Sequence, residues 1–97
     1  MKLKLVQTCG ACPESYECFT PEGEEIGYLR LRHGGFYAEY LPTGEVVYTA
    51  EPKGDGCFEY DERNYYLGEA CDALIRRHQN QSLEVKDNFY IGDYDGN

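Results

Sequence analysis

The sequence predicts an α+β fold in which an antiparallel β-meander of four to six strands packs against one α-helix, at about residues 61–78. Strand-like runs separated by short turns fill the first half of the chain, and a stripe of apolar residues at helical spacing lies in the second half. The chain has 97 residues. We therefore expect a single domain over residues 1–97 with one small core, because two independent cores would each be too small to be stable.

Residues 26–50 contain the three clearest strand-like runs. The first two runs are separated by Gly34 and Gly35. Two glycines between alternating runs indicate a tight hairpin, because the turns that match strand twist need positive φ angles, which glycine adopts without strain. With these two glycines as the loop, Arg30 is expected opposite Glu39, and the pair would stabilise the sheet by about 0.2 to 1 kcal/mol.

Alternation along these strands sorts their side chains onto two faces. The expected core side is mostly apolar: Leu29, Leu31, Phe36, Ala38, Tyr40 and Val47. The other side is amphipathic: Tyr28, Arg30, Arg32, Tyr37, Glu39 and Tyr48. Arginines beside tyrosines form a candidate docking surface, because guanidinium groups stack on rings and the phenol keeps a polar tip. The same residue types are also ordinary on the solvent side of a strand, so both interpretations stand.

The flanking segments predict the remaining elements. Residues 3–5 alternate with lysines, which suits a first strand at a sheet edge, and residues 16–20 form a second run. Asp61 is a candidate N-cap for the helix. The runs at residues 83–85 and 89–91 predict a last strand or hairpin. The helix stripe that should face the sheet is Tyr66, Leu67, Ala70, Cys71, Leu74 and His78.

The acidic composition restricts the classes of partner. Eighteen acidic residues against nine basic residues give a net charge of -9. This charge repels nucleic acid and anionic membranes at long range and attracts basic proteins, although acidity for solubility alone is the ordinary explanation. No apolar run reaches the length of a membrane span, and the start of the chain does not have the pattern of a signal peptide. The expected location is the cytoplasm.

The five cysteines leave three interpretations open. They are Cys9, Cys12, Cys18, Cys57 and Cys71. Cys9 and Cys12 have the spacing that lets two thiolates bind one zinc ion from a single turn, but a structural zinc site usually needs a second such pair, and the sequence has none. The cysteines could instead be free thiols, or a redox or disulfide pair.

The sequence carries no recognisable catalytic set. Neither His33 nor His78 has an evident nucleophile or carboxylate partner at a useful spacing, and no phosphate-binding glycine motif is present. We therefore expect a protein that is not an enzyme and that needs no cofactor, apart from the zinc ion considered above.

Three segments carry a resemblance to a known group of proteins. The run IGYLRLRHG at residues 26–34, with residues 9–13 before it and residues 54–58 after it, resembles a class of small uncharacterised proteins of gut-type bacteria and their phages. The resemblance covers most of the chain. It implies a mobile-element setting, in which small acidic proteins often act by occluding a larger host machine, and it transfers no residue role to any position.

These observations lead to three hypotheses of different classes. The first is a non-enzymatic acidic binding protein that docks on a basic, nucleic-acid-handling protein partner, as a phage or mobile-element inhibitor such as an anti-defence protein would. The second is a small-ligand binder that holds an anionic nucleotide with Arg30, Arg32 and the neighbouring tyrosines. The third is an interaction module stabilised by zinc at Cys9 and Cys12. Direct binding to nucleic acid is not expected.

Overall fold

The protein is an α+β fold built on one sheet and one helix. The computed structural model describes residues 1–8, 13–54, 56–79 and 89–92. Within these residues the sheet has six strands in the order β5-β4-β3-β2-β1-β6. The elements are β1 Leu3–Gln7, β2 Ser15–Phe19, β3 Glu25–Arg32, β4 Gly35–Tyr40, β5 Glu45–Ala50, α1 Arg63–Gln79 and β6 Phe89–Ile91. The predicted fold class and antiparallel meander are confirmed for β1 to β5, which pair in chain order.

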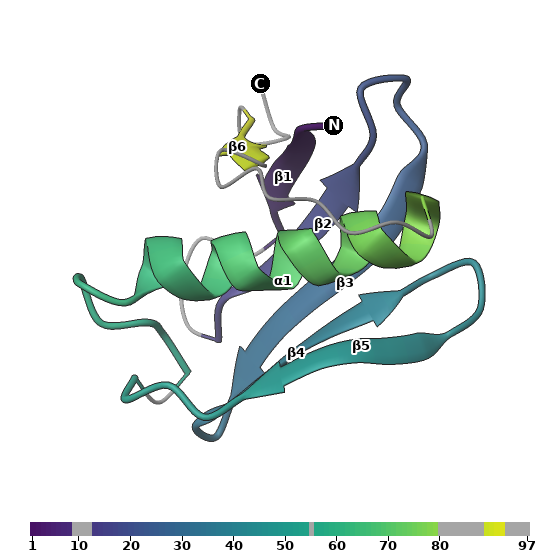
Figure 1. Ribbon diagram of the computed structural model, residues 1–97. Helices are drawn as coiled ribbons and strands as arrows, with labels where there is room; N and C mark the ends of the chain where they lie inside the picture. The colour runs from purple at the N-terminus through teal and green to yellow at the C-terminus, as the bar shows by residue number, and fades with distance from the viewer. Residues whose placement is uncertain (9–12, 55, 80–88, 93–97) are drawn as a thin grey trace.

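Helix α1 lies across one face of the sheet, with β5 and β6 at opposite margins (Figure 1). It has 17 residues and begins two residues later than the sequence predicted. The middle of the predicted stripe is confirmed as the buried face. At its ends Tyr66 and His78 are only half-buried, and Ile75, which the periodicity did not single out, is fully buried. The buried residues of α1 are Leu67, Ala70, Cys71, Leu74 and Ile75.

The helix packs closely on the sheet at Gly27. A Cβ atom at Gly27 would lie 2.5 Å from Cδ1 of Leu74 and 3.2 Å from Cβ of Cys18. Both neighbours are fully buried, so neither side chain has free space to move into. Glycine at this position of β3 therefore allows α1 to pack directly on the middle of the sheet.

The hairpin between β3 and β4 turns one residue earlier than expected. His33 and Gly34 have φ angles of 53° and 74°, the pattern of a turn with two left-handed central residues. Gly35 pairs with Arg32 inside the ladder. The expected loop of Gly34 and Gly35 is therefore wrong, because histidine tolerates the left-handed region well enough to take the first turn position.

This turn changes the pairing but preserves the faces. Arg30 lies opposite Tyr37, so the expected Arg30–Glu39 pair is wrong, and Glu39 instead lies opposite Tyr28. The shift of each partner is two residues. Since side chains alternate with a period of two, every residue of the hairpin stays on the face that the sequence predicted.

A bulge in β5 moves one predicted residue to the other face. Ala38 pairs with Tyr48 while Glu39 pairs with Val46, which leaves Val47 as an extra residue. The extra residue breaks the alternation, so Val47 and Tyr48 both pack against the core on the α1 side. The expectation that Tyr48 lies on the outer face is therefore wrong.

The last described strand closes the sheet beside the first. Strand β6 runs parallel to β1, and the Gly92 N–H donates a hydrogen bond to the Leu5 carbonyl at 2.7 Å. The strand predicted at residues 89–91 is confirmed, whereas the run at residues 83–85 lies outside the described residues. In the described part of the chain, no helix is both long enough and apolar enough to cross a membrane.

Candidate functional site

The face of the sheet opposite α1 carries the candidate docking residues. The strand register places Tyr28 between Glu17 of β2 and Glu39 of β4. In the next row, Arg30 lies beside Tyr37. Because α1 packs on the other face, no helix in the described ranges covers these side chains. We call Tyr28, Arg30, Arg32, Tyr37 and Glu39 the outer face.

The centre of the outer face combines rings with unpaired positive charge. The rings of Tyr28 and Tyr37 meet edge to face, with their centroids 6.5 Å apart. Arg30 is half-buried and Arg32 is exposed, and neither forms an ion pair with any described residue. The rings and guanidinium groups can stack, and the guanidinium groups can hold a carboxylate or phosphate through two parallel hydrogen bonds.

A shallow hollow of about 700 Å³ lies beside these arginines. Its lining residues include Arg30, Arg32, Tyr37, Thr49 and Glu51. The hollow holds more positive than negative charge, in a protein that is strongly acidic overall. Its two arginines can therefore hold an anionic group.

Tyr48, the sixth residue predicted for this site, lies apart from the outer face. Its ring meets the ring of Phe36 edge to face on the α1 side, with centroids 6.1 Å apart. Burial, followed by the charge of Glu69, raises the pKa of the Tyr48 phenol to about 12. Tyr48 therefore packs against the core and lines the groove between β5 and α1, and it is not part of the candidate docking surface.

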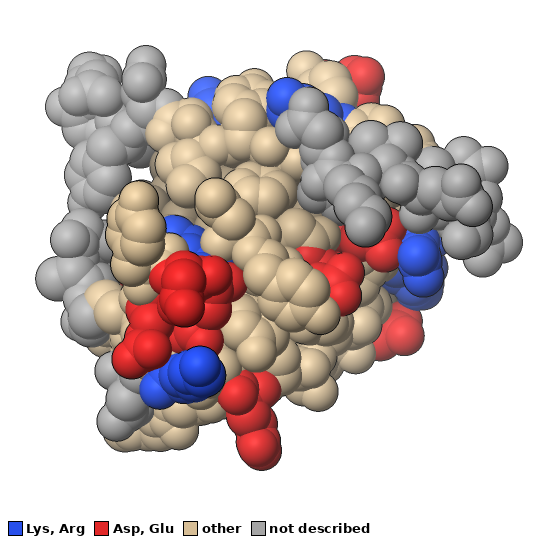
Figure 2. All heavy atoms as spheres, turned by 60° about the vertical axis from the view of Figure 1, so that its left-hand side comes forward, with Lys and Arg blue, Asp and Glu red and all other residues tan. Residues whose placement is uncertain are grey.

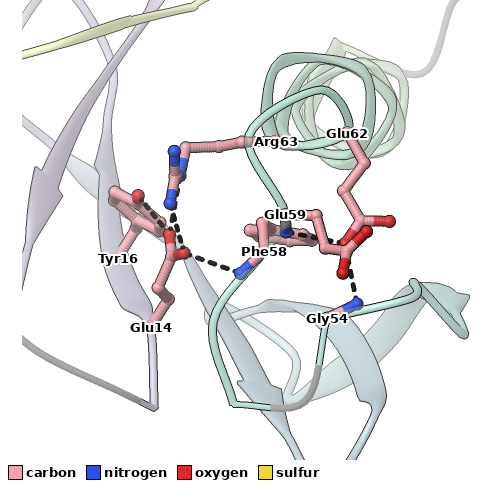
Figure 3. Close-up of polar contacts among 7 residues, drawn as sticks. All are labelled: Glu14, Tyr16, Gly54, Phe58, Glu59, Glu62 and Arg63. Carbon is pink, nitrogen blue, oxygen red and sulfur yellow. Dashed lines mark hydrogen bonds and ion pairs between the residues drawn. The ribbon is translucent and has the colours of Figure 1, made fainter.

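A buried carboxylate joins three distant segments at the start of α1 (Figure 3). Glu14 is 2% exposed. Its Oε1 accepts hydrogen bonds from the Phe58 N–H at 2.8 Å and from Nη2 of Arg63 at 2.7 Å. Its Oε2 accepts from Nε of Arg63 at 3.0 Å and from the Tyr16 hydroxyl at 2.8 Å. The carboxylate is thus surrounded by donors.

The electrostatics of Glu14 follow from these contacts. Burial by itself would raise the pKa of Glu14, but hydrogen bonds from Arg63, Tyr16 and Phe58, with the charge of Arg63, outweigh burial and lower that pKa. Burial and the neighbouring Glu14 carboxylate raise the pKa of Tyr16. A carboxylate held ionised by four donors is a poor proton acceptor, so this cluster supports the fold rather than acid–base chemistry.

Glu62 organises the loop before α1 in the same manner. Its Oε1 accepts from the Lys53 N–H at 2.9 Å, and its Oε2 accepts from the N–H groups of Gly54 and Glu59 at 2.8 and 2.9 Å. Slight burial raises the pKa of Glu62, and these backbone donors lower it to a net value below its usual range. The helix begins at Arg63, and the Glu62 carbonyl accepts from the Tyr66 N–H at 3.2 Å, so Glu62 takes the cap position and the expected cap at Asp61 is wrong.

A second cluster ties the end of α1 to β4 and β5. The Tyr40 hydroxyl and Nδ1 of His78 are 2.8 Å apart and share a hydrogen bond. The Arg77 guanidinium lies over the Tyr40 ring, 4.9 Å from its centroid, and its Nε donates to Oε1 of Glu45 at 2.9 Å. The sequence could not identify this cluster, because His78 and Tyr40 are 38 residues apart.

The three cysteines that the structure describes fall into two groups. Cys18 and Cys71 are free and fully buried, and burial followed by contact with Cys71 raises the pKa of the Cys18 thiol. This matches the free-thiol interpretation and makes Cys18 unreactive. Cys57 is disulfide-bonded, so the disulfide interpretation that the sequence left open applies to this cysteine.

The predicted zinc ligands Cys9 and Cys12 lie outside the described residues. Among the residues that the structure does describe, no group of three or more His, Cys, Asp or Glu side chains is arranged to hold a metal ion. The zinc hypothesis therefore remains a prediction from the sequence.

The fold and the outer face define a small α+β protein with one sheet face that no described helix covers. Comparisons of the chain with protein-family models, with curated proteins and with solved structures find no match.

Proposed function

We propose that this chain is a non-enzymatic binding protein that docks through its outer face on a protein partner with a basic surface. The observation that supports this proposal most directly is the grouping of Tyr28, Tyr37, Arg30 and Arg32 on the sheet face that α1 leaves uncovered. Tyrosine and arginine are enriched among the residues that dominate binding energy at protein interfaces.

The charge distribution supports a basic partner. Glu17 and Glu39 flank Tyr28 on the outer face itself. Further acids gather around the loop that precedes α1, at the end of the molecule that Figure 2 shows, where Glu51, Glu59 and Asp61 are exposed. The net charge of -9 would speed encounter with a positive surface, while the central arginines and rings would make short-range contacts.

Positive surfaces of this kind are typical of proteins that handle nucleic acids, because their clefts must attract phosphate. An acidic protein that covers such a cleft would inhibit the nucleic-acid-handling protein by blocking access of its substrate to the cleft. The resemblance to phage and bacterial proteins noted above supports an inhibitory role against a defence enzyme, as an anti-defence protein.

Salt-graded capture from host lysate tests the proposal. The wild-type protein and a double variant, Arg30→Ala with Tyr37→Ala, are immobilised and washed with sodium chloride rising from about 50 to 500 mM, across which electrostatic attraction is strongly screened. We expect a protein with a basic surface to bind the wild type at low salt, to elute as salt rises, and to be lost from the variant.

A matched control changes the same residue types elsewhere. Arg76→Ala with Tyr65→Ala removes an exposed arginine and an exposed tyrosine from α1, and it should leave capture unchanged. Equal thermal stability of the two double variants would show that both are folded. Failure to capture any protein at low salt, or equal capture by the outer-face variant, would refute docking through this face.

A second candidate function is supported by the hollow beside Arg30 and Arg32. Its volume of about 700 Å³ and its excess of arginine suit an anionic nucleotide stacked against Tyr37. A nucleotide panel tested by thermal unfolding distinguishes this function, since a ligand at one hundred times its Kd adds about 2.7 kcal/mol of stability. The shift should disappear in Arg30→Ala with Arg32→Ala; no shift with any nucleotide would contradict this candidate.

A further inference from the structure

Strand β5 has an open edge. It forms one margin of the sheet, and no strand in the described part of the chain pairs with its outer side. An edge strand presents N–H and C=O groups that can pair with another extended segment. Protein domains that bind peptides by strand addition use such an edge for affinity and the neighbouring hollows for specificity.

Two hollows border this edge, one on each side of the sheet. On the α1 side, a groove of about 650 Å³ lies between the first part of β5 and the helix, with Val47, Tyr48 and Ala73 among its lining residues. On the other side, the hollow of about 700 Å³ reaches Thr49 and Ala50 at the end of β5. Side chains of an added strand point alternately to the two faces, so successive residues would reach the groove and the hollow in turn.

The bulge in β5 supplies apolar surface along the same edge. It turns both Val47 and Tyr48 toward α1, where they are half-buried. Val46 remains 52% exposed, although it is a β-branched apolar residue in a strand. Exposed apolar surface beside unpaired backbone is typical of a strand that gains a partner.

The charges on the two sides of β5 differ in sign. In the groove, Arg76 is paired with Asp72 at 3.0 Å and Arg77 with Glu45 at 2.9 Å, which leaves the Glu69 carboxylate in excess. In the opposite hollow, Arg30 and Arg32 outnumber the single acid, Glu51. A complementary strand would therefore place basic side chains toward α1 and acidic side chains toward the arginines.

A second copy of this chain fits the edge poorly. Acidic residues, Glu45 and Glu51, stand at both ends of β5. Antiparallel pairing of two β5 strands would place Glu45 of one copy beside the end of the other that carries Glu51, and like charges facing each other across a ladder are destabilising. Each copy also carries a net charge of -9.

We propose that the edge of β5, with the groove beneath α1, binds an extended segment of a partner protein by strand addition. The segment alternates basic and acidic side chains, with the basic ones directed into the groove and the acidic ones directed toward Arg30 and Arg32. This goes beyond the proposed function, because it requires no docking of the outer face as a whole.

Selection from a displayed library of random eight-residue peptides provides the probe. We expect the recovered peptides to share alternating basic and acidic positions and to bind as synthetic peptides in a fluorescence anisotropy titration. Binding should shift the backbone amide resonances of residues 45–50 and 69–77 more than those of any other described segment. No recovered peptide, or amide shifts confined to other segments, would overturn the proposal.

Three variants separate strand addition from other kinds of binding. Val46→Lys places a charge at the edge, and Ala73→Arg fills the groove, so each should weaken peptide binding at least tenfold. Ile91→Lys is the matched control, because Ile91 is 48% exposed in β6 at the opposite margin. Tyr28→Ala should also leave peptide binding unchanged, which distinguishes failure of this proposal from failure of the proposed function.

Two further outcomes would count against the proposal. Peptide affinity that is equal in Val46→Lys and in the wild type would show that the edge is not used. Sedimentation that reveals a dimer of the wild type, and a monomer of Val46→Lys, would show that a second copy occupies the edge instead. Thermal unfolding of each variant would confirm that it remains folded.

Discussion

At the scale of single residues, Glu14 connects several separate parts of the structure. Its backbone also contributes, since the Glu14 N–H donates to the Gly56 carbonyl at 2.6 Å and its carbonyl accepts from the Leu31 N–H at 2.9 Å. Side chain and backbone together join β2, β3, the loop before α1 and the helix itself. Removing the charge should therefore loosen the whole end of the molecule.

The substitution Glu14→Gln should lower the free energy of unfolding by about 2 to 3 kcal/mol, because buried donors lose a charged acceptor. The loss is moderated because the Arg63 side chain is 35% exposed and water can solvate it. Urea unfolding at pH 7 measures the effect. Glu17→Gln, the same change at a half-exposed position of β2, is the control and should stay within about 0.5 kcal/mol of the wild type.

The lowered pKa of Glu14 predicts that the stability difference between wild type and Glu14→Gln depends on pH. The pKa of Glu14 is lowered in the folded state, so its stabilising effect is present above the pKa of the unfolded chain, about 4.3, and is lost as pH falls through the lower folded value. The stability difference between wild type and Glu14→Gln should shrink as pH falls from 5 toward 3. A difference that stays constant across this range would contradict the assignment.

His33 adopts a left-handed conformation, which asparagine favours and which a β-branched residue adopts only with strain. Substitution by asparagine should stabilise the protein by about 0.5 kcal/mol, whereas His33→Val should destabilise it by about 1 to 2 kcal/mol. Thermal unfolding measures both. Thr49→Val, in an exposed and ordinary strand position, is the control and should change little. If His33→Val and Thr49→Val change the thermal stability equally, the left-handed conformation of His33 is contradicted.

The sequence could not predict these residue-level features for a common reason. The partners of Glu14 lie 44 and 49 residues away, so no local pattern contains them. The displacement of Tyr48 depends on one extra residue in β5, and the sequence carries no glycine or proline there to mark it. Five of the six predicted outer-face residues were nevertheless placed correctly, because alternation along a strand is local.

At the scale of secondary-structure elements, the contact between α1 and β3 depends on the absence of a side chain at Gly27. Gly27→Ala should destabilise the protein by about 1 to 3 kcal/mol, since the new methyl group would overlap Leu74. Chemical denaturation measures the change. Gly35→Ala is a matched control, because a Cβ there would meet only the Arg32 carbonyl at 3.5 Å, an ordinary contact distance.

A double-mutant cycle identifies the overlap as the cause. If Leu74 is what the new methyl group meets, the combined variant Gly27→Ala with Leu74→Ala should be more stable than the sum of the single effects by about 1 kcal/mol. If the two destabilising effects are strictly additive, the destabilisation by Gly27→Ala arises from the backbone of β3 and not from contact with Leu74.

Elements were more predictable than their relations to one another. The helix was predicted to within two residues at each end, because the apolar stripe has its own period. The hairpin register was wrong by two residues, since Gly34 and Gly35 offered a more usual turn than His33 and Gly34. The predicted faces were still correct, because the register error was an even number of residues.

At the scale of the whole molecule, the excess of negative charge should weaken the folded state through self-repulsion. Raising sodium chloride from about 20 to 300 mM should stabilise the protein by about 1 kcal/mol, or roughly 5 °C in Tm for a domain of this size. Glu22→Lys with Glu51→Lys, both exposed, reduces the net charge and should flatten this salt dependence. Equal salt dependence in the two proteins would refute the self-repulsion.

The overall architecture followed from the sequence as far as the meander and its covering helix. The placement of β6 did not, since parallel pairing joins segments far apart in the chain and leaves no short turn to indicate it. The remaining pairs are neighbours along the chain, which explains why they could be predicted.

The parallel pairing of β6 with β1 has a consequence for folding. One side of β1 pairs with a strand that lies far later in the chain, so that side of β1 stays unpaired until β6 has docked. A folding intermediate, or a variant that cannot form β6, would therefore expose the backbone of β1 to pairing with foreign polypeptide.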